Sequence, residues 1–167
     1  MEFTSQVAHI LHDDHVRTMG VLDRVQGVLA GHKATEPPDL DQFAVRMALD
    51  GLVVAVEGEI GGHFAFEEET LFPLLTDAGD SQLAGALSEE HTVLLPLARR
   101  VSALARAART DGFTPETWRE FYRSGHEFID QLMGHIEKEE TGLLPLFDGV
   151  LSEEEDSELS TQYLMER

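Results

Sequence analysis

Eight histidines occur in this sequence, and four of them stand in repeated patterns with acidic residues. The stronger repeat is His63-Phe-Ala-Phe-Glu67 and His135-Ile-Glu-Lys-Glu139, each continued by a second glutamate and, at equal offsets, by leucine, proline and leucine. Four residues span about 400° of an α-helix, so the histidine and glutamate of each window share one helix face, one turn apart. Imidazole nitrogens and carboxylate oxygens both ligate metal ions, and the repeat therefore predicts two metal-binding helix faces.

A weaker repeat places a histidine in each of two further segments, Asp13-Asp14-His15 and Glu89-Glu90-His91. In a helical bundle, one histidine from each of four helices and a glutamate from alternate helices can converge on one level of the interior. A carboxylate can bridge two cations, whereas a neutral imidazole gives one nitrogen to one cation, so this set suits a two-metal centre. Nitrogen and oxygen ligands with open positions favour iron. The candidate ligands are His15, His63, Glu67, His91, His135 and Glu139.

The segments that carry these residues have the apolar period of α-helices, with almost no alternating stretches. Loops rich in glycine, proline and aspartate separate them, and Pro96 is expected to bend the third helix. Four long helices with short connections predict an all-α, up-down-up-down four-helix bundle over residues 1–150. The predicted helices run from Thr4 or Ser5 to Gly31, from Asp39 to about Leu75, from Ser88 to Asp111 after a short turn at Gln82–Leu87, and from Thr114 to about Phe147.

Residues 151–167 are rich in glutamate. Ser152 and Glu155 match a capping box, which predicts a short C-terminal helix that packs against the bundle through Leu159, Tyr163 and Leu164. A frayed acidic tail is the alternative reading of the same segment.

Charge and composition narrow the class of partner. Acidic residues outnumber basic ones by 32 to 12, and a net charge of −20 repels phosphate backbones and anionic lipid surfaces. Nucleic acid and membrane partners are therefore disfavoured. Cysteine is absent, which excludes disulfides, iron–sulfur ligation and thiolate zinc sites. No apolar stretch approaches the roughly 20 residues of a membrane helix and no secretory signal opens the sequence, so a cytoplasmic location is expected.

The two windows, which continue as Leu71-Phe72-Pro73 and Leu143-Leu144-Pro145, together with His15 and His91 resemble the hemerythrin-like, or HHE cation-binding, family. The resemblance extends over about residues 6–147. It implies two iron ions joined by an oxo or hydroxo bridge, with the four histidines as terminal ligands and the two glutamates as bridging carboxylates. Activities in this family include reversible oxygen binding, oxygen or iron sensing, iron–sulfur cluster repair, and reactions with nitric oxide or peroxide.

One position departs from the classical oxygen carriers of the family, which place a second histidine four residues after the first in the third helix. Here that position is Leu95. Fewer nitrogen ligands leave more open coordination positions, which favours a peroxidase-like, catalase-like or nitric-oxide-consuming reaction over oxygen carriage or sensing. The expected partners are small oxidants or diatomic gases and an electron donor of unspecified identity. Cluster repair is disfavoured, because repair proteins of the family usually carry an additional cysteine-bearing N-terminal region.

Several further residues are weighed for the site. Five residues span about 500°, so Glu68 and Glu140 lie about 140° from the face of their histidine, and Glu69 also points away from it. This predicts contact with solvent or with a neighbouring helix, and solvated charge is the favoured role. Glu140 is a minor rival to Glu139 as a ligand. His12 lies one turn before His15 and is expected at the rim or behind a ligand, with a fifth ligand as the alternative. The spacing does not require Tyr122 or Tyr163 at the site, and it disfavours His9, His32 and His126 as ligands.

Overall fold

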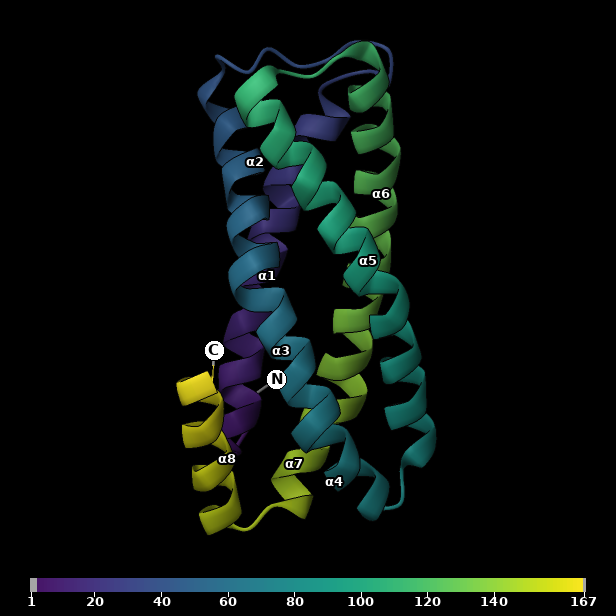
Figure 1. Cartoon of the computed structure of the whole chain (residues 1–167). Helices are drawn as coiled ribbons and strands as arrows, with labels where there is room; N and C mark the ends of the chain where they lie inside the picture. The colour runs from purple at the N-terminus through teal and green to yellow at the C-terminus, as the bar shows by residue number, and fades with distance from the viewer. Residues whose placement is uncertain (1–2, 167) are drawn as a thin grey trace.

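A computed structural model describes residues 3–166, except for the side chains of Glu59 and Glu166, and consists of helices joined by short loops (Figure 1). Three of the helical segments are π-helical turns, labelled η, that continue an α-helix without a break. In chain order the segments are α1 (Gln6–Ala30), α2 (Phe43–Val54), η1 (Ala55–Ile60), α3 (Gly61–Phe66), η2 (Glu67–Leu71), α4 (Phe72–Asp77), α5 (Ser81–Asp111), α6 (Pro115–Lys138), η3 (Glu139–Leu143), α7 (Leu144–Val150) and α8 (Glu153–Glu166).

Four long helical runs form the bundle: α1, α2 through α4, α5, and α6 through α7 (Figure 1). Helices α1 and α5 each pack against both α2 and α6. The runs alternate in direction, so the all-α, up-down-up-down bundle predicted from the sequence is confirmed. The described residues contain no strand, and none of their helices combines the length and apolar character needed to cross a membrane.

Two helix starts differ from the sequence prediction. The second run begins at Phe43 rather than at Asp39, because Asp39 instead closes a turn in which its carboxylate accepts the amide hydrogen of Asp41 at 2.9 Å. The third run begins at Ser81 rather than at Ser88, because the Asp80 side chain caps α5.

The cap at Asp80 explains the earlier start of α5. Its carboxylate accepts the amide hydrogen of Leu83 at 3.1 Å, and the expected short turn at Gln82–Leu87 instead forms the first turns of α5. Leu87 is wholly buried, so the apolar face of the helix extends through this segment. The helix then continues through Pro96. The fourth run begins after the cap Thr114, as predicted, and extends to Val150 rather than to Phe147.

The buried apolar side chains form two separate cores, one toward each end of the bundle. The larger core contains Trp118 and Phe128, and the smaller core contains Leu11 and Phe147. On α1, the smaller core ends at Leu11 and the larger one begins at Val21, which places His15 between them. The polar residues predicted from the sequence thus lie in a layer that apolar side chains cover from above and below.

Helix α8 packs along the N-terminal half of α1, outside the four runs (Figure 1). The helical alternative for the C-terminal segment is therefore confirmed, with the predicted capping box: the Ser152 amide donates to Glu155 at 2.9 Å, and the Glu155 amide donates to the Ser152 hydroxyl at 3.3 Å. The buried carboxylate of Asp156 reaches back to α1, where it accepts the amide hydrogens of Gln6 at 2.6 Å and Val7 at 3.0 Å. It therefore neutralises free N–H groups at the start of α1.

We expect Asp156→Ala to lower the free energy of unfolding by about 1–3 kcal/mol, because α1 loses buried acceptors at its N-terminus. Chemical denaturation followed by circular dichroism measures the change. Glu154→Ala is the matched control, since it removes an exposed acid from the same turn of α8, and we expect a change within about 0.5 kcal/mol. Equal effects of the two substitutions would contradict the capping role of Asp156.

Candidate metal centre

The repeated windows of the sequence are also repeated in the backbone geometry. Glu67 and Glu139 each occupy the first residue of a π-helical turn, and their carbonyl oxygens accept amide hydrogens from five residues onward, those of Phe72 and Leu144. A proline follows in both cases, at the second residue of the next α-helix, and a proline cannot donate a backbone hydrogen bond. Single π-helical turns inside α-helices are frequent at functional sites.

Glu67 lies between two histidines from different helical runs. Its Oε1 is 3.1 Å from Nε2 of His63, one turn earlier, and its Oε2 is 3.5 Å from Nε2 of His91 on α5. All three side chains are buried. Each oxygen of this carboxylate therefore faces a different imidazole.

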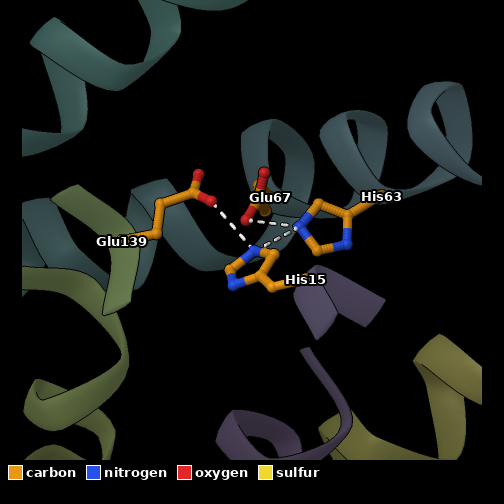
Figure 2. A group of neighbouring side chains, drawn as sticks. All are labelled: His15, His63, Glu67 and Glu139. Atoms are coloured by element: carbon orange, nitrogen blue, oxygen red, sulfur yellow. Dashed lines mark hydrogen bonds and ion pairs between the residues drawn. The ribbon is translucent and has the colours of Figure 1, made fainter. Parts of the chain in front are cut away.

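Glu139 makes the equivalent pair of contacts on the other side. Its Oε1 is 2.8 Å from Nε2 of His135, one turn earlier, and its Oε2 is 3.1 Å from Nε2 of His15 on α1. Figure 2 shows Glu139 and Glu67 approaching His15 and His63 from two different runs of the bundle. The structure thus brings together all six of the candidate ligands predicted from the sequence.

The four imidazoles are themselves paired through the same nitrogens. Nε2 of His15 is 3.3 Å from Nε2 of His63, and Nε2 of His91 is 3.0 Å from Nε2 of His135. Each pair forms a group with both glutamates in which the potential ligand atoms all lie within 4.8 Å of one another. The two groups overlap at the shared carboxylates, so the geometry offers two adjacent ligand sets rather than one.

The opposite nitrogen of each imidazole, Nδ1, contacts a different side chain farther from the centre. A carboxylate accepts the Nδ1 hydrogen of three of the rings, which leaves their Nε2 with a free lone pair directed into the centre. The Nδ1 distances are 2.6 Å from His15 to Glu140, 2.9 Å from His91 to Glu68, 2.9 Å from His135 to Glu90, and 3.0 Å from His63 to the Tyr163 hydroxyl.

Glu68 and Glu140 therefore contact a neighbouring helix, which is the alternative to the favoured role as solvated charges, and Glu68 is at the same time 43% exposed. Both follow a π-helical turn's first residue, where the backbone no longer has the 100° step on which the prediction relied. Glu69 is exposed, as predicted. Two sequence features correspond to these outer partners. One is the second glutamate of each window, and the other is the acidic residue directly before His91, Glu90, which contacts His135.

The remaining histidines lie outside the two ligand sets. Nδ1 of His12 is 3.0 Å from Oε1 of Glu140, the carboxylate that also contacts His15. His12 therefore lies behind a ligand candidate, as expected, and not in a ligand set. His32 bonds the carbonyl oxygen of Val28 at 2.8 Å, far from the centre. His126 packs edge-on against the ring of Tyr122.

The pKa values of the two central carboxylates move in opposite directions. Burial raises the pKa of Glu67, and the neighbouring charge of Glu139 raises it further. Burial acts in the same direction on Glu139, but the imidazoles of His135 and His15 outweigh it and lower the pKa of this group. Two carboxylates this close cannot both stay ionised in a buried site without a compensating positive charge.

The imidazoles respond differently to the same environment. Burial and the nearby charge of His135 lower the pKa of His91 to about 3. Burial also acts to lower the pKa of His15 and of His135, but their contacts with Glu139 and with the outer carboxylates outweigh it and raise the pKa of both.

A small cavity adjoins the candidate metal centre, and the midpoint of a water-sized molecule can occupy about 20 Å³ of it. That volume is close to what one water molecule requires. Its polar lining comes from Asp14, His15, Thr18, His63, His135 and Glu139, and its apolar lining from Ile60, Phe64, Leu132 and Ile136.

Comparison with known proteins agrees with this geometry. The family model of the hemerythrin HHE cation binding domain matches residues 6–147, which carry all six of the central residues. The chain belongs to this family. No solved structure gives a significant match to the hemerythrin HHE chain described here.

Curated relatives share the name iron-sulfur cluster repair protein YtfE. The protein from Cronobacter sakazakii is 29% identical over 83% of this chain and 63% of its own length. The protein from Escherichia coli O139:H28 is 28% identical over 63% of this chain and 49% of its own length. The chain thus spans about half to two thirds of the length of these relatives.

The residues of this hemerythrin HHE domain fit a bound cation. When the hydrogen of each imidazole is on Nδ1, as the outer partners favour, no donor among the described residues is aimed at the carboxylate oxygens of Glu67 or Glu139, although both side chains are wholly buried. A buried acceptor without a donor costs about 1–3 kcal/mol, and more when it is charged. The Nε2 lone pairs converge on the same space, so a metal ion would satisfy nitrogens and oxygens together.

We expect alanine at His63, His91, His135 or Glu139 to weaken iron binding by at least roughly 10–100-fold, because each substitution removes a ligand atom. Loss of a residue that only hydrogen-bonds a ligand already costs that much metal affinity. Iron content per chain after equilibration with a competing chelator measures this. His32→Ala and His126→Ala are matched controls that remove an imidazole elsewhere in the bundle, and we expect wild-type iron content from both.

We also expect iron affinity to fall as the pH falls, since protons compete for the ligand atoms. The raised pKa values of His15 and His135 mean that these rings hold protons above the ordinary imidazole value of 6.5, and the raised pKa of Glu67 extends the competition to a carboxylate. Chelator competition at pH steps from about 8 to about 5 should show progressive release through and below the imidazole range. Constant affinity across that range would contradict ligation by these histidines.

Proposed function

We propose that this chain holds two iron ions and that the centre reacts with small oxidants, namely peroxide or nitric oxide. The observation that carries the proposal is the pair of overlapping ligand sets. Each set has two histidines of its own, and the two sets share Glu67 and Glu139. A carboxylate with two oxygens facing different imidazoles is suited to bridge two cations.

Bound iron would supply a ferrous–ferric couple and coordination positions for a small oxidant. Two imidazole nitrogens and two carboxylate oxygens would hold each metal ion, and the protein would offer no further ligand from these sets to compete with a small oxidant. The chain's own contribution is to fix the imidazoles from behind through Nδ1 and to keep the carboxylates dry between the two apolar cores.

The cavity supports a small substrate. The centre of a molecule has about 20 Å³ of space in it, which suits a diatomic gas or peroxide. The apolar lining by Ile60, Phe64 and Leu132, beside the carboxylates of Asp14 and Glu139, favours neutral molecules over anions. The net charge of −20 acts in the same direction and supports small neutral partners over nucleic acid.

Leu95 distinguishes this proposal from reversible oxygen binding. It is half-buried in a surface groove beside Phe64 and His91, at the position where the classical carriers place another ligand histidine. Leucine has no ligand atom, so a nitrogen that would fill one coordination position is missing. Oxygen carriage or sensing is thereby the less favoured use of the same centre.

The curated relatives support a second candidate, in which the centre takes part in iron–sulfur cluster repair. This rests on the similarity over 83% of the chain to a protein of that name. A test is to mix the iron-loaded chain with an iron–sulfur enzyme whose cluster nitric oxide has damaged. Recovery beyond that given by equal free ferrous iron would favour repair, whereas recovery equal to free iron would count against it.

Anaerobic titration with ferrous iron, followed by mixing with peroxide, nitric oxide or oxygen, tests the first candidate. We expect saturation at two iron ions per chain, because the two ligand sets share their carboxylates. We then expect peroxide or nitric oxide to be consumed faster than by the same amount of free iron, and oxygen to oxidise the centre without a long-lived adduct. Stopped-flow visible spectra follow each reaction.

The controls separate the alternatives. His135→Ala should lose the reaction together with its iron, and His126→Ala should keep both. Saturation at one metal ion would overturn the two-iron centre. An oxygenated spectrum that reverses on removal of oxygen would instead establish the carrier alternative.

A further inference from the structure

The outer partners of the four central histidines follow a pseudo-symmetric pattern with one exception. The second glutamate of each window reaches the histidine of a neighbouring run, Glu68 to His91 and Glu140 to His15. The acidic residue before His91, Glu90, reaches His135. The corresponding residue before His15 is Asp14, and by this pattern it should serve the fourth imidazole, that of His63.

Asp14 does not make that contact directly. Its Oδ2 is 3.7 Å from Nδ1 of His63, whereas the equivalent carboxylate oxygen of Glu90 is 2.9 Å from Nδ1 of His135. Aspartate is one methylene shorter than glutamate, which accounts for the difference in reach. The hydroxyl of Tyr163 fills this position, 3.0 Å from Nδ1 of His63 and hydrogen-bonded to Asp14.

The direction of the hydrogen bonds follows from the groups involved. The phenol donates its hydrogen to the Asp14 carboxylate, so its oxygen is available to accept the Nδ1 hydrogen of His63. An imidazole that carries its hydrogen on Nδ1 has a free lone pair on Nε2, which here faces Glu67 at 3.1 Å. Tyr163 therefore favours the tautomer and ring orientation of His63 that a metal ion requires.

Tyr163 belongs to α8, which lies outside the family match over residues 6–147. Its side chain is 2% exposed, and its ring packs against that of Phe66 with the centroids 4.6 Å apart. The buried carboxylate of Asp156 fixes the same helix to the start of α1. The C-terminal helix thus places one buried side chain behind a residue of the centre.

We propose that Tyr163 is a positioning residue for the metal centre and that α8 thereby sets the metal affinity of the His15–His63 half. This inference rests on the two-metal centre proposed above. The other half, with His91 and His135, has carboxylates of the four runs behind both imidazoles and does not depend on α8. Loss of the phenol hydroxyl should therefore affect one metal ion and not the other.

The test is Tyr163→Phe in the full chain, with anaerobic ferrous iron binding measured by calorimetry against a competing chelator. We expect one of the two binding steps to weaken by about 10–100-fold and the other to stay within about twofold, since outer partners of ligand histidines contribute on that scale. Tyr122→Phe is the matched control, because it removes the other tyrosine hydroxyl, which lies far from the centre beside Trp118 and His126.

A second readout does not depend on metal stoichiometry. Nitrogen NMR of the ¹⁵N-labelled, iron-free chain reports which ring nitrogen of His63 carries hydrogen, and we expect the Nδ1 tautomer in the wild type and a loss of that preference in Tyr163→Phe. Asp156→Ala, which loosens α8 but keeps the hydroxyl, should weaken the same binding step.

Two results would overturn the inference. One is unchanged binding and an unchanged His63 tautomer in Tyr163→Phe. The other is equal weakening of both steps with a lower melting temperature of the iron-free chain, which would assign the residue to general stability. A wild-type chain that saturates at one metal ion would overturn the two-iron proposal instead, and the His63 tautomer would still decide the role of Tyr163.

Discussion

Two wholly buried carboxylates at the centre of the bundle, Glu67 and Glu139, are the constraint on which the rest of the structure depends. Burial of an ionised carboxylate costs several kcal/mol unless other groups compensate it, and among the described residues the groups in reach are the four imidazoles, which can donate to the carboxylates only when Nε2 carries a hydrogen. Their pKa values diverge for the same reason. The imidazoles of His135 and His15 lower the pKa of Glu139, and the charge of Glu139 together with burial raises the pKa of Glu67. Cations between them would remove this conflict, and the surrounding imidazoles have their lone pairs directed to that place.

The sequence repeats divide this task between adjacent residues. In each window the first glutamate faces the centre, and the second holds an imidazole of another run from behind, as Glu68 does for His91. A π-helical turn begins at the first glutamate, and its different rotation allows neighbouring residues to act on both sides of an imidazole. The acidic residues around the centre therefore orient the imidazoles as well as carry charge, as Glu68, Glu90 and Glu140 do.

The fold and the six central residues could be predicted from the sequence because both depend on period and spacing. The helix faces and the convergence of His63 with Glu67 follow from the 3.6-residue turn, and the caps at Ser5 and Thr114 follow from a hydroxyl side chain placed directly before an apolar period. The contacts of Glu68 and Glu140 could not, because a π-helical turn changes the angle between consecutive residues, and the contact of Glu90 with His135 depends on how α5 packs against α6. Tyr163 was beyond the same reasoning, since its position depends on how α8 packs against α1 and not on spacing within its own helix.

The outer partners also make His63 different from the other three central histidines. The side chains of Glu68, Glu90 and Glu140 are 43%, 30% and 21% exposed, so His91, His135 and His15 are each one hydrogen bond from water. His63 instead has the buried hydroxyl of Tyr163 behind it. The small cavity is lined by His15 and His63 of one ligand set and by His135 of the other, so a small molecule there would reach both sets. Among the described residues that line it, none belongs to α8. The asymmetry that α8 creates therefore concerns how the imidazole of His63 is held, and not where the cavity lies.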